Sequence, residues 1–366
     1  MGASVSRIVG HLDLDYFYAQ VEEVEAPSLK GKPVVVCVFS GRTEDSGVVS
    51  TANYTARGYG VKSGIPITVA KRRLSGVDAA FIPMDHGKYE VYSDRIMDIV
   101  RARVDVLEQA GIDEAYFDIT KRVGGDYGEA SALARGLKAK ILEEEKLTCS
   151  VGIGPNKVVA KIASDYKKPD GLTVVQEAEA KSFLSTMPIT KISGVGPKTD
   201  KLLEDLGITT IQVLASSPLQ RLEDVLGKKL AVYLHNAANG ADDEPVAENS
   251  EATQLSRIVT LKHDTDAVEQ IVVELTPALK DLVNKLVSRN LFFKNVSVIG
   301  IRKELSMRTK SKTLEAPTSE YAVLEKEVRE LLKALLAETG VLRRAGVRVS
   351  GLENMVDQHS LTEFTS

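Results

Sequence analysis

The sequence predicts a multidomain α+β fold. The chain has 366 residues, more than a single ordinary hydrophobic core requires, and 43% of them are hydrophobic, as in folded proteins. Two strand–helix–strand units follow one another in the first half, a rhythm typical of a ferredoxin-like sandwich. From about residue 183 short helices separated by glycine and proline take over, and strands return after residue 253. These changes of pattern indicate several domains.

The first α+β region opens with residues 7–15, which alternate apolar and polar side chains like a strand. Residues 16–25 have the spacing of a helix whose first turn is aromatic and whose later turns are acidic. Pro33 to Phe39 is a continuous apolar run and predicts a buried strand. The elements expected after it are a short helical piece at 52–60, a helix at 89–106, a strand at 110–120, a helix at 128–145, a strand at 147–153 and a helix at 156–168.

The second half predicts a small helical region, a linker and another α+β region. The linker, residues 239–253, carries five acidic residues and no basic residue, which is typical of an exposed segment. After the linker we expect a strand at 256–263, a helix ending at 291, strands within 295–314, a helix at 319–336 and a strand at 343–352.

Composition excludes several classes of protein. Charged residues make up 27% of the chain, and no apolar run reaches the roughly 18 residues of a spanning helix, so a membrane protein is not expected. Cys37 and Cys149 lie in apolar stretches and are expected to be buried thiols, which fits a reducing cytoplasm better than secretion. The net charge of −4 means that any contact with nucleic acid requires a local concentration of basic residues.

Three acidic residues interrupt strands that otherwise look buried. Asp13 lies between Leu12 and Leu14, and Asp113 with Glu114 lies inside a second apolar stretch. An isolated ionised carboxylate in such a place costs several kcal/mol, so it needs protonation, a cationic partner or a metal ion. Oxygen ligands from two strands would suit a pair of Mg²⁺ ions about 4 Å apart.

A second interpretation of these acids is purely structural. Asp13 or Asp15 could cap the helix that follows, with Asp15 the better placed of the two, and Asp113 could pair with a lysine. Adjacent residues of an extended strand point to opposite faces, so Asp113 and Glu114 can share a metal site only near a strand end or a bend. Spacing alone leaves both interpretations open.

Six segments of the chain together resemble one enzyme family. They are LDLDYFYAQVEE, GKPVVVCVFSGR, STANYTARGYGVKSGIP, GIDEAYFDI, SVGIGPNKVVAKIASDYKKPDG and SGVGPKTDKLLEDLGI. In this order they closely resemble the Y-family, lesion-bypass DNA polymerases of DNA polymerase IV type, the archaeal ones in particular. The resemblance implies a right-hand polymerase with a ferredoxin-like palm (1–16 and 83–175), small fingers (17–82), a helical thumb with a helix-hairpin-helix (176–240), a linker (241–253), an α+β little finger (254–350) and a tail (351–366).

The same resemblance implies an activity and partners. We expect a DNA-directed DNA polymerase that performs translesion synthesis, transferring nucleotides from dNTPs to a primer 3′-OH with two Mg²⁺ ions. Low fidelity and no proofreading are expected, because no segment is left over for an exonuclease. The expected partners are primer-template DNA, dNTPs and a sliding clamp, and the expected state is a cytoplasmic monomer without membrane contact.

Site residues follow by matching motifs. The family's metal-binding carboxylates match Asp13, Asp113 and Glu114, with the backbone carbonyl of Leu14 as a further ligand. The aromatic steric gate, which would clash with a ribose 2′-hydroxyl, matches Tyr18. The residues that hold the incoming triphosphate match Thr51, Tyr54, Arg57 and Lys168. Taken singly, a tyrosine–arginine pair on a helix or a lysine before a proline is more often a solvated surface feature.

Two basic elements are candidates for DNA contact. Gly194 and Gly196 permit a tight turn whose N–H groups can face a phosphate, with Lys198 beside them, although a plain helix hairpin is the alternative. A ribbon with net charge +4 spans residues 302–312, and its alternate residues are expected to share one strand face. A solvated edge strand protected by lysines is the other interpretation. The ribbon consists of Arg302, Lys303, Arg308, Lys310 and Lys312, and Arg343, Arg344 and Arg348 could extend its surface.

The C-terminal tail resembles a sliding-clamp-binding peptide of the Gln-x-x-Leu-x-x-Phe kind. Gln358, Leu361 and Phe364 match that pattern, and the two apolar side chains would enter a pocket of the clamp. Thr365 stands where the motif usually has a second aromatic residue. A frayed polar tail without a partner is the alternative.

Two rival functions can be separated from polymerisation. A nucleotide cyclase uses the same palm and two-metal chemistry, but it requires no phosphate-gripping hairpin and no basic C-terminal domain. A catalytically idle, clamp-tethered DNA-binding factor would not require intact carboxylates.

Overall fold

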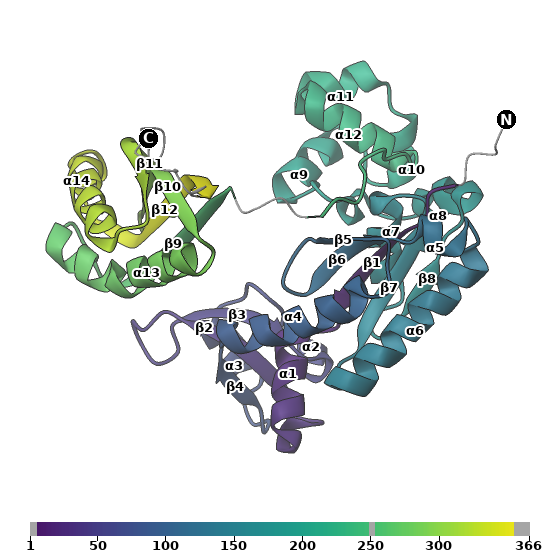
Figure 1. The fold of residues 1–366 in the computed structure, drawn as a ribbon, viewed down its shortest axis with the longest axis horizontal. Helices are drawn as coiled ribbons and strands as arrows, with labels where there is room; N and C mark the ends of the chain where they lie inside the picture. Colours follow the sequence, from purple (N-terminus) through teal and green to yellow (C-terminus); the bar gives the residue numbers. More distant parts are fainter. Residues whose placement is uncertain (1–5, 249–252, 355–366) are drawn as a thin grey trace, which may run out of the picture. The chain divides into compact units, whose positions relative to one another are not determined.

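The structure is a computed structural model that describes residues 6–248 and 253–354 (Figure 1). These residues form two compact units, each considered by itself. The first holds the described residues up to 37 together with 49–65 and 72–248, and the second holds 38–48, 66–71 and 253–354. No helix in these ranges is both long enough and apolar enough to cross a bilayer.

A five-stranded sheet organises the first unit. Its strand order is β5-β6-β1-β7-β8, and the central strand β1 runs antiparallel to both of its neighbours (Figure 1). The strands are β1 (Val9–Leu14), β5 (Val106–Gln109), β6 (Glu114–Asp118), β7 (Cys149–Gly154) and β8 (Leu172–Val174).

Helices cover both faces of this sheet. Leu12 and Leu14 of β1 point into a core shared with α4 (His86–Arg101) and α6 (Tyr127–Glu145). His11 and Asp13 point to the opposite face, where α7 (Lys157–Tyr166) lies. Two helices on one face of a largely antiparallel sheet form the predicted sandwich, so the α+β class is confirmed. The short α5 (Thr120–Val123) precedes α6.

The packing of α7 on β7 is unusually close because of one glycine. A Cβ atom built on Gly152 would collide with the carbonyl oxygen of Ala160 and the backbone nitrogen of Ser164, both in α7. Only a residue without a side chain therefore allows the helix backbone to approach the strand this closely. This approach brings the α7 side chains within reach of the carboxylates on β1 and β6.

The region between α1 and α4 has more regular structure than the sequence predicted. A three-stranded sheet of order β3-β2-β4 forms there. The sequence predicted β2, but not β3, β4, α3 or the sheet strand β5, because these elements are short and β3 is rich in small polar residues. The elements are α1 (Phe17–Glu25), the 3₁₀ turn η1 (Pro27–Leu29), β2 (Val34–Phe39), β3 (Gly47–Ala52), α2 (Tyr54–Gly58), α3 (Ile67–Arg73) and β4 (Ala80–Pro83).

The predicted small helical region is confirmed and has its own apolar core. Leu203, Leu214, Leu222 and Leu234 are fully buried there, one from each of its last four helices. The elements are η2 (Glu177–Glu179), α8 (Ala180–Ser185), η3 (Ile189–Lys191), α9 (Pro197–Asp205), α10 (Ile211–Ser216), α11 (Leu219–Leu226) and α12 (Lys228–Ala238).

Most of the described part of the acidic linker is exposed, as the sequence predicted, but its start is held against the sheet. Val246 is only 8% exposed and packs with Val9 of β1. Arg7 donates hydrogen bonds to the backbone carbonyls of residues 242–244, and Lys157 Nζ lies 2.9 Å from Glu244 Oε1. The linker therefore leaves the helical region along the sheet, because its carbonyls and one carboxylate find cationic partners there.

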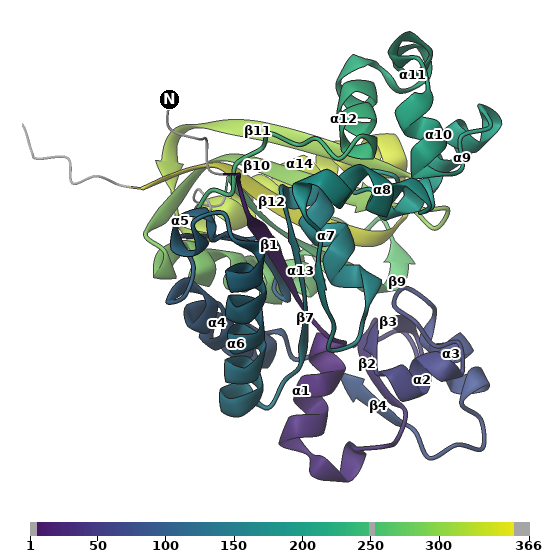
Figure 2. The ribbon, with the colours of Figure 1, turned by 90° about the vertical axis from the view of Figure 1, so that its right-hand side faces the viewer.

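The second unit contains a four-stranded antiparallel sheet of order β11-β10-β12-β9. The strands are β9 (Gln254–Thr265), β10 (Leu291–Ile301), β11 (Met307–Thr318) and β12 (Leu342–Asn354). Two helices, α13 (Val268–Ser288) and α14 (Tyr321–Thr339), cover one face and share a leucine-rich and valine-rich core with the sheet (Figures 1 and 2). The predicted α+β region is confirmed, with strands longer than expected.

We expect Gly152→Ala to lower the free energy of unfolding by about 3 kcal/mol or more, because the added methyl group meets backbone atoms that cannot turn away. Chemical denaturation followed by circular dichroism measures this change. Gly136→Ala is the matched control: Gly136 is exposed within α6, a Cβ atom there meets nothing within 4 Å, and a gain of about 0.5–1 kcal/mol is expected. Equal effects of the two substitutions would contradict the close packing of α7.

Candidate active site

The three predicted carboxylates gather at one end of the strand pair β1–β6. Asp13 and Glu114 are direct partners in the antiparallel register. Residues directly opposite each other in such a pair have Cβ atoms about 5 Å apart. Asp113 adjoins them, since the Leu14 N–H donates a 2.8 Å hydrogen bond to the Asp113 carbonyl. Two segments a hundred residues apart in sequence therefore place their acids side by side.

The position of Asp113 corrects the expected strand. The sequence placed both acids in the middle of a strand at 110–120, but residues 111–113 form a bend and β6 begins at Glu114. The chain changes direction between the two acids, so they are not forced onto opposite faces of the sheet. This is the strand end that a shared site requires.

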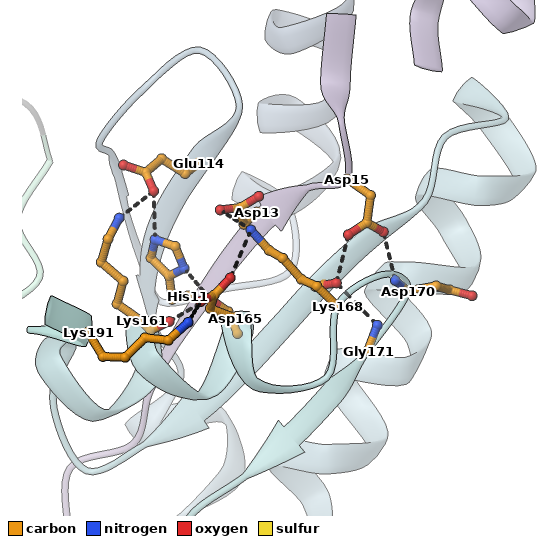
Figure 3. A network of polar contacts seen from close by, with 12 residues as sticks. His11, Asp13, Asp15, Glu114, Lys161, Asp165, Lys168, Asp170, Gly171 and Lys191 are labelled. Carbon is orange, nitrogen blue, oxygen red and sulfur yellow. Dashed lines mark hydrogen bonds and ion pairs between the residues drawn. The ribbon is translucent and has the colours of Figure 1, made fainter. Parts of the chain in front are cut away.

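Lysine side chains hold two of the three carboxylates (Figure 3). Lys168 Nζ lies 2.7 Å from Asp13 Oδ2, and Lys161 Nζ forms an ion pair with Glu114 Oε2. His11 Nε2 lies 3.3 Å from the same Glu114 oxygen. Asp113 has no ion-pair partner among the residues that the structure describes. The alternative in which Asp113 pairs with a lysine is therefore wrong, whereas Asp13 does have such a partner.

The carboxylates differ in their affinity for protons. Burial raises the pKa of Asp13 although Lys168 opposes the shift, and burial together with the charge of Glu114 raises the pKa of Asp113. Contact with His11 and with the Lys161 ammonium lowers the pKa of Glu114 to about 2. Burial lowers the pKa of His11, which favours the neutral imidazole. The cluster thus has more buried negative charge than its surroundings stabilise.

This donor set fits hard divalent cations. Carboxylate and carbonyl oxygens are the ligands such ions prefer, and the raised pKa values mark carboxylates that a cation would stabilise. Within residues 6–248 and 253–354, however, no three acidic, histidine or cysteine side chains are arranged as a ready ligand set. Two of the carboxylates form ion pairs with lysines instead, Glu114 with Lys161 and Asp13 with Lys168.

Asp15 does not have the capping role that the structural interpretation gave it. The residue at the N-cap of α1 is Tyr16, with φ 36°, and no side chain caps the helix. The Asp15 side chain instead accepts hydrogen bonds from Thr148, Ser150 and the backbone N–H of Asp170 (Figure 3). It joins the end of β1 to the start of β7 and to the loop that carries Lys168.

The predicted nucleotide-binding residues of α2 lie on one face, as their spacing indicated. The Arg57 guanidinium carbon is 4.7 Å from the centre of the Tyr54 ring, and Arg57 Nε donates to the Ala52 carbonyl. Burial raises the pKa of Tyr54, and the charges of Asp15 and Asp13 add to the shift, so this tyrosine lies near the acidic cluster. Thr51, in β3, is half-buried.

Tyr18, the predicted steric gate, is held by another aromatic ring. Its ring stacks on Tyr89 with the ring centres 4.2 Å apart and the planes 14° apart. The Tyr89 hydroxyl donates a hydrogen bond to Glu22, which fixes the Tyr89 ring. Burial raises the pKa of Tyr18, and the charge of Asp113 adds to the shift.

A pocket beside Asp13 contains several cationic side chains. It is lined by three lysines, by His11 of β1 and by residues of α7. The lysines are Lys161, Lys168 and Lys191. Each of the three ammonium groups pairs with a carboxylate: Lys161 with Glu114, Lys168 with Asp13 and Lys191 with Asp165 (Figure 3). An anionic ligand in this pocket would have to replace these carboxylates as the partner of the lysines.

Sequence reasoning missed His11, Lys161, Lys191 and Tyr89. Two signals could have indicated the first two. His11 is two residues before Asp13 and therefore lies on the same strand face. Lys161 interrupts an apolar helix and lies seven residues before Lys168, a spacing of two turns in the helix predicted at 156–168. Nothing in the local sequence marks Lys191 or Tyr89.

The glycine turn of the helical region has the expected local form. Gly194 has φ 91°, a left-handed conformation that favours glycine, and Gly196 is the N-cap residue of α9. Lys198 is exposed in the first turn of that helix. The backbone therefore makes the tight turn that the sequence predicted.

In the second unit, the basic ribbon is not as strongly positive as its sequence indicated. Arg308, Lys310 and Lys312 do share one face of β11, where their partners on β10 are Gly300, Val298 and Val296. That face is the one that α14 covers. Lys310 pairs with Glu338, Lys312 pairs with Glu327 and Glu330, and Arg302 pairs with Glu304 of the β10–β11 turn, which leaves Lys303 exposed beside it. The net charge of +4 was counted over residues 302–312 alone. It therefore left out the α14 glutamates, which are distant in sequence.

Arginines of β12 lie on the other face of that sheet. Ala345, Val347 and Val349 point into the helix-covered core, so Arg344 and Arg348 alternate with them on the uncovered face. The Nε of Arg344 is buried and has no hydrogen-bond partner. Arg343, the neighbour of Arg344, is half-buried. The clamp-binding residues Gln358, Leu361 and Phe364 lie outside the described residues.

Comparisons with known proteins agree with this geometry. The impB/mucB/samB family matches residues 12–165, its C-terminal domain matches residues 252–362, and a DNA polymerase-iota thumb domain matches residues 190–242. DNA polymerase IV of Nitrosopumilus maritimus is 44% identical over 98% of this chain and 99% of its own length. DNA polymerase IV of Methanosarcina acetivorans is 42% identical over 98% of this chain and 100% of its own length.

Solved structures of DNA polymerases are also similar to this chain. A Y-family DNA polymerase chimera of Dbh and Dpo4 has a TM-score of 0.87 at 39% identity, covering 95% of this chain and 99% of that one. An insertion ternary complex of Dbh DNA polymerase has a TM-score of 0.69 at 38% identity, covering 95% of this chain and 99% of that one. The resemblance seen in the sequence is therefore confirmed. The chain belongs to the Y-family DNA polymerases, of the DNA polymerase IV type.

Proposed function

We propose that this DNA-directed DNA polymerase extends a primer by inserting dNTPs opposite template bases, damaged ones included, with two Mg²⁺ ions in its active site. The observation that carries the proposal is the pairing of Asp13 with Glu114 across β1 and β6, with Asp113 adjoining them. The enzymes of this family use divalent metal ions, and the choice of Mg²⁺ rests on the oxygen donor set.

The ligands of the two ions would be the carboxylates of Asp13, Asp113 and Glu114 and the carbonyl of Leu14. Bound there, the ions supply charge neutralisation at the triphosphate and activation of the primer 3′-oxygen. The polypeptide has little covalent chemistry to perform in such a reaction. Its task is to hold the reacting groups in line and to balance the developing charge.

Lysines exchange partners in this proposal. Lys168 now pairs with Asp13, at 2.7 Å, and Lys161 pairs with Glu114. Lys168 and Lys161 would leave these oxygens when a cation binds, because an ammonium group and a cation compete for the same carboxylates. Lys168 then faces the pocket beside Asp13 and can bind the triphosphate, while Tyr54, Arg57 and Thr51 bind it from the side of α2.

DNA contact is proposed for both units. The turn at Gly194 and Gly196, with Lys198 beside it, offers backbone N–H groups to a phosphate. Arg302, Lys303, Arg343 and Arg344 would hold the duplex backbone without reading sequence. Arg308, Lys310 and Lys312 would contribute only if phosphates replace the α14 glutamates as partners of the two lysines.

The remaining features of the proposal come from the sequence. Low fidelity without proofreading is proposed from the small fingers and from the membership of the Y-family. The enzyme is proposed to act as a cytoplasmic monomer, and both cysteines are buried thiols, as expected for a reducing environment.

The first test is primer extension with a primer-template duplex, Mg²⁺ and four dNTPs. The wild-type chain is expected to give template-directed products, whereas Asp113→Asn should give none above about one-thousandth of the wild-type rate, because a metal ligand is lost. DNA binding, measured by fluorescence anisotropy, should be unchanged. Cyclic nucleotide produced without DNA, or DNA binding without extension by the wild type, would contradict the proposal in favour of one of its two rivals.

The same variant separates catalysis from stability. The pKa of Asp113 is raised in the folded state, so its ionisation costs stability above that pKa and costs nothing below the unfolded value. Asp113→Asn should therefore raise the melting temperature at neutral pH by roughly 1–4 °C, a gain that disappears in acid. Asp98→Asn, a change at an exposed residue of α4 that pairs with Arg101, is the control and should leave extension unchanged.

A second test addresses the sugar. Tyr18→Ala is expected to increase incorporation of ribonucleotides relative to deoxynucleotides by about 100-fold or more, because the ring that would clash with a 2′-hydroxyl is gone. Steady-state incorporation of dCTP and CTP opposite a template guanine measures the ratio. Tyr89→Leu is the companion variant: it leaves Tyr18 in place without its stacked neighbour, and a smaller effect is expected. Unchanged sugar discrimination in Tyr18→Ala would remove Tyr18 from the role.

A third test concerns the tail. A Leu361→Ala/Phe364→Ala double variant should lose stimulation of extension by a sliding clamp and keep its clamp-free rate, because the two apolar anchors are removed. Thr365→Phe restores the second aromatic residue and should tighten clamp binding in isothermal titration calorimetry. Thr362→Ala is the control. Equal stimulation of the double variant and the wild type would contradict clamp binding by the tail.

A further inference from the structure

Asp15 is a buried acid that the proposed reaction does not use. It is 1% exposed and lies two residues after Asp13, at the point where β1 ends. It caps no helix and pairs with no cation among the described residues. A buried carboxylate of this kind is costly unless several donors satisfy its oxygens.

Two hydrogen-bonded routes connect Asp15 to the loop between α7 and β8, one direct and one through Ser150 (Figure 3). Its Oδ2 accepts from the Thr148 hydroxyl and from the Asp170 N–H, both at 2.8 Å, and its Oδ1 accepts from the Ser150 hydroxyl at 2.8 Å. The Ser150 oxygen in turn accepts from the Gly171 N–H at 3.2 Å. Two consecutive N–H groups of the loop are therefore fixed by Asp15, one directly and one through Ser150.

This loop carries the lysine that reaches the acidic cluster. Lys168 lies two residues before Asp170, and its side chain pairs with Asp13. Asp13 therefore holds the loop through the Lys168 side chain, and Asp15 holds it through the Asp170 backbone N–H. Asp170 has φ 53°, a conformation that residues other than glycine adopt seldom, and the loop therefore needs outside contacts to keep it. Lys138 Nζ, 2.6 Å from Asp170 Oδ1, holds the loop from its other side.

We propose that Asp15 is a positioning residue that holds the loop 167–171 so that Lys168 is aimed at the incoming triphosphate. The inference rests on the proposed role of Lys168. When the ammonium leaves Asp13 for a phosphate, the side-chain contact to β1 is lost and the backbone contact through Asp15 remains. Asp15 thus keeps the loop in place during the step in which Lys168 changes partner.

An aspartate is the residue that this position requires. Its carboxylate accepts from three donors at once, two hydroxyl groups at the start of β7 and one backbone N–H of the loop. An asparagine has the same shape, but its amide nitrogen is a donor. In place of Oδ2 it would face the Asp170 N–H and the Thr148 hydroxyl, and in place of Oδ1 it would face the Ser150 hydroxyl. Asp15→Asn therefore disturbs one of the two routes to the loop with little change in volume.

The test is single-turnover nucleotide incorporation by the full chain on a primer-template duplex with Mg²⁺. Asp15→Asn is expected to weaken the apparent dNTP affinity about tenfold, the effect of one hydrogen bond to a charged group, while the maximal rate falls less than about threefold. Thr148→Val is the control, since it removes a donor to the same carboxylate that does not belong to the loop. Its dNTP affinity should stay within about twofold of the wild type.

A double variant identifies the route of the effect. If Asp15 acts through Lys168, Asp15→Asn/Lys168→Ala should bind dNTP no more weakly than Lys168→Ala alone, within about twofold. If the double variant instead loses dNTP affinity by the product of the two single losses, Asp15 does not act through Lys168 and the inference is overturned. A lowered melting temperature of Asp15→Asn with unchanged dNTP affinity would show that Asp15 only stabilises the fold, and would overturn it too. If Lys168→Ala itself leaves dNTP affinity unchanged, the proposed role of Lys168 fails as well.

Ser150→Ala is a milder variant in case Asp15→Asn does not fold. It removes the oxygen that joins Asp15 to the Gly171 N–H and leaves the Asp170 contact intact. A loss of dNTP affinity of about threefold, absent from the Lys168→Ala background, supports the inference. A loss of the same size in both backgrounds overturns it.

Discussion

The first unit depends on one electrostatic constraint, the concentration of negative charge where β1 meets β6. Asp13 and Glu114 are cross-strand partners, and Asp113 adjoins them. Burial raises the pKa of both aspartates, so the ionised cluster requires cations close by. Lys161 and Lys168 supply them, and long lysine side chains are suited to the task because they can change partner without moving the backbone. In the proposed reaction, metal ligation and phosphate binding would be linked through the same pairs of charges.

The packing of α7 makes this charge balance possible. Gly152 lets the helix backbone lie against β7, and this close approach brings Lys161 to Glu114 and Ser164 to His11. Strand β1 serves both sides of the arrangement, since alternate residues point into the α4–α6 core and toward α7. Stability and chemistry therefore depend on the same strand and on one glycine contact, and a change in the distance between helix and sheet would alter both.

In the first unit lysines stabilise buried carboxylates, whereas in the second unit glutamates neutralise surface lysines. Its lysines on β11 are neutralised by glutamates of α14, and this pairing fits a chain whose net charge is −4. Ion pairs at an exposed surface are individually weak, and salt screens them, so phosphates can compete for the same lysines. The arginines of β12 lie on the uncovered face instead, and the Nε of Arg344 has no partner. DNA affinity in this enzyme would then depend on exchange of partners more than on excess positive charge.

The amino-acid sequence by itself determined the α+β class, the order of the long helices and the identity of the three carboxylates. These follow from periodicity and from six ordered motifs, which are properties of short stretches of chain. Only the tertiary structure decided that Asp113 lies in a bend, that Asp15 binds the Lys168 loop instead of capping α1, and that Glu338 neutralises Lys310. Each of these depends on strand register and on contacts between residues far apart in sequence, such as the 155 positions between Asp15 and Asp170. A local pattern cannot specify such pairs, because the free energy that selects them arises only when the whole core has packed.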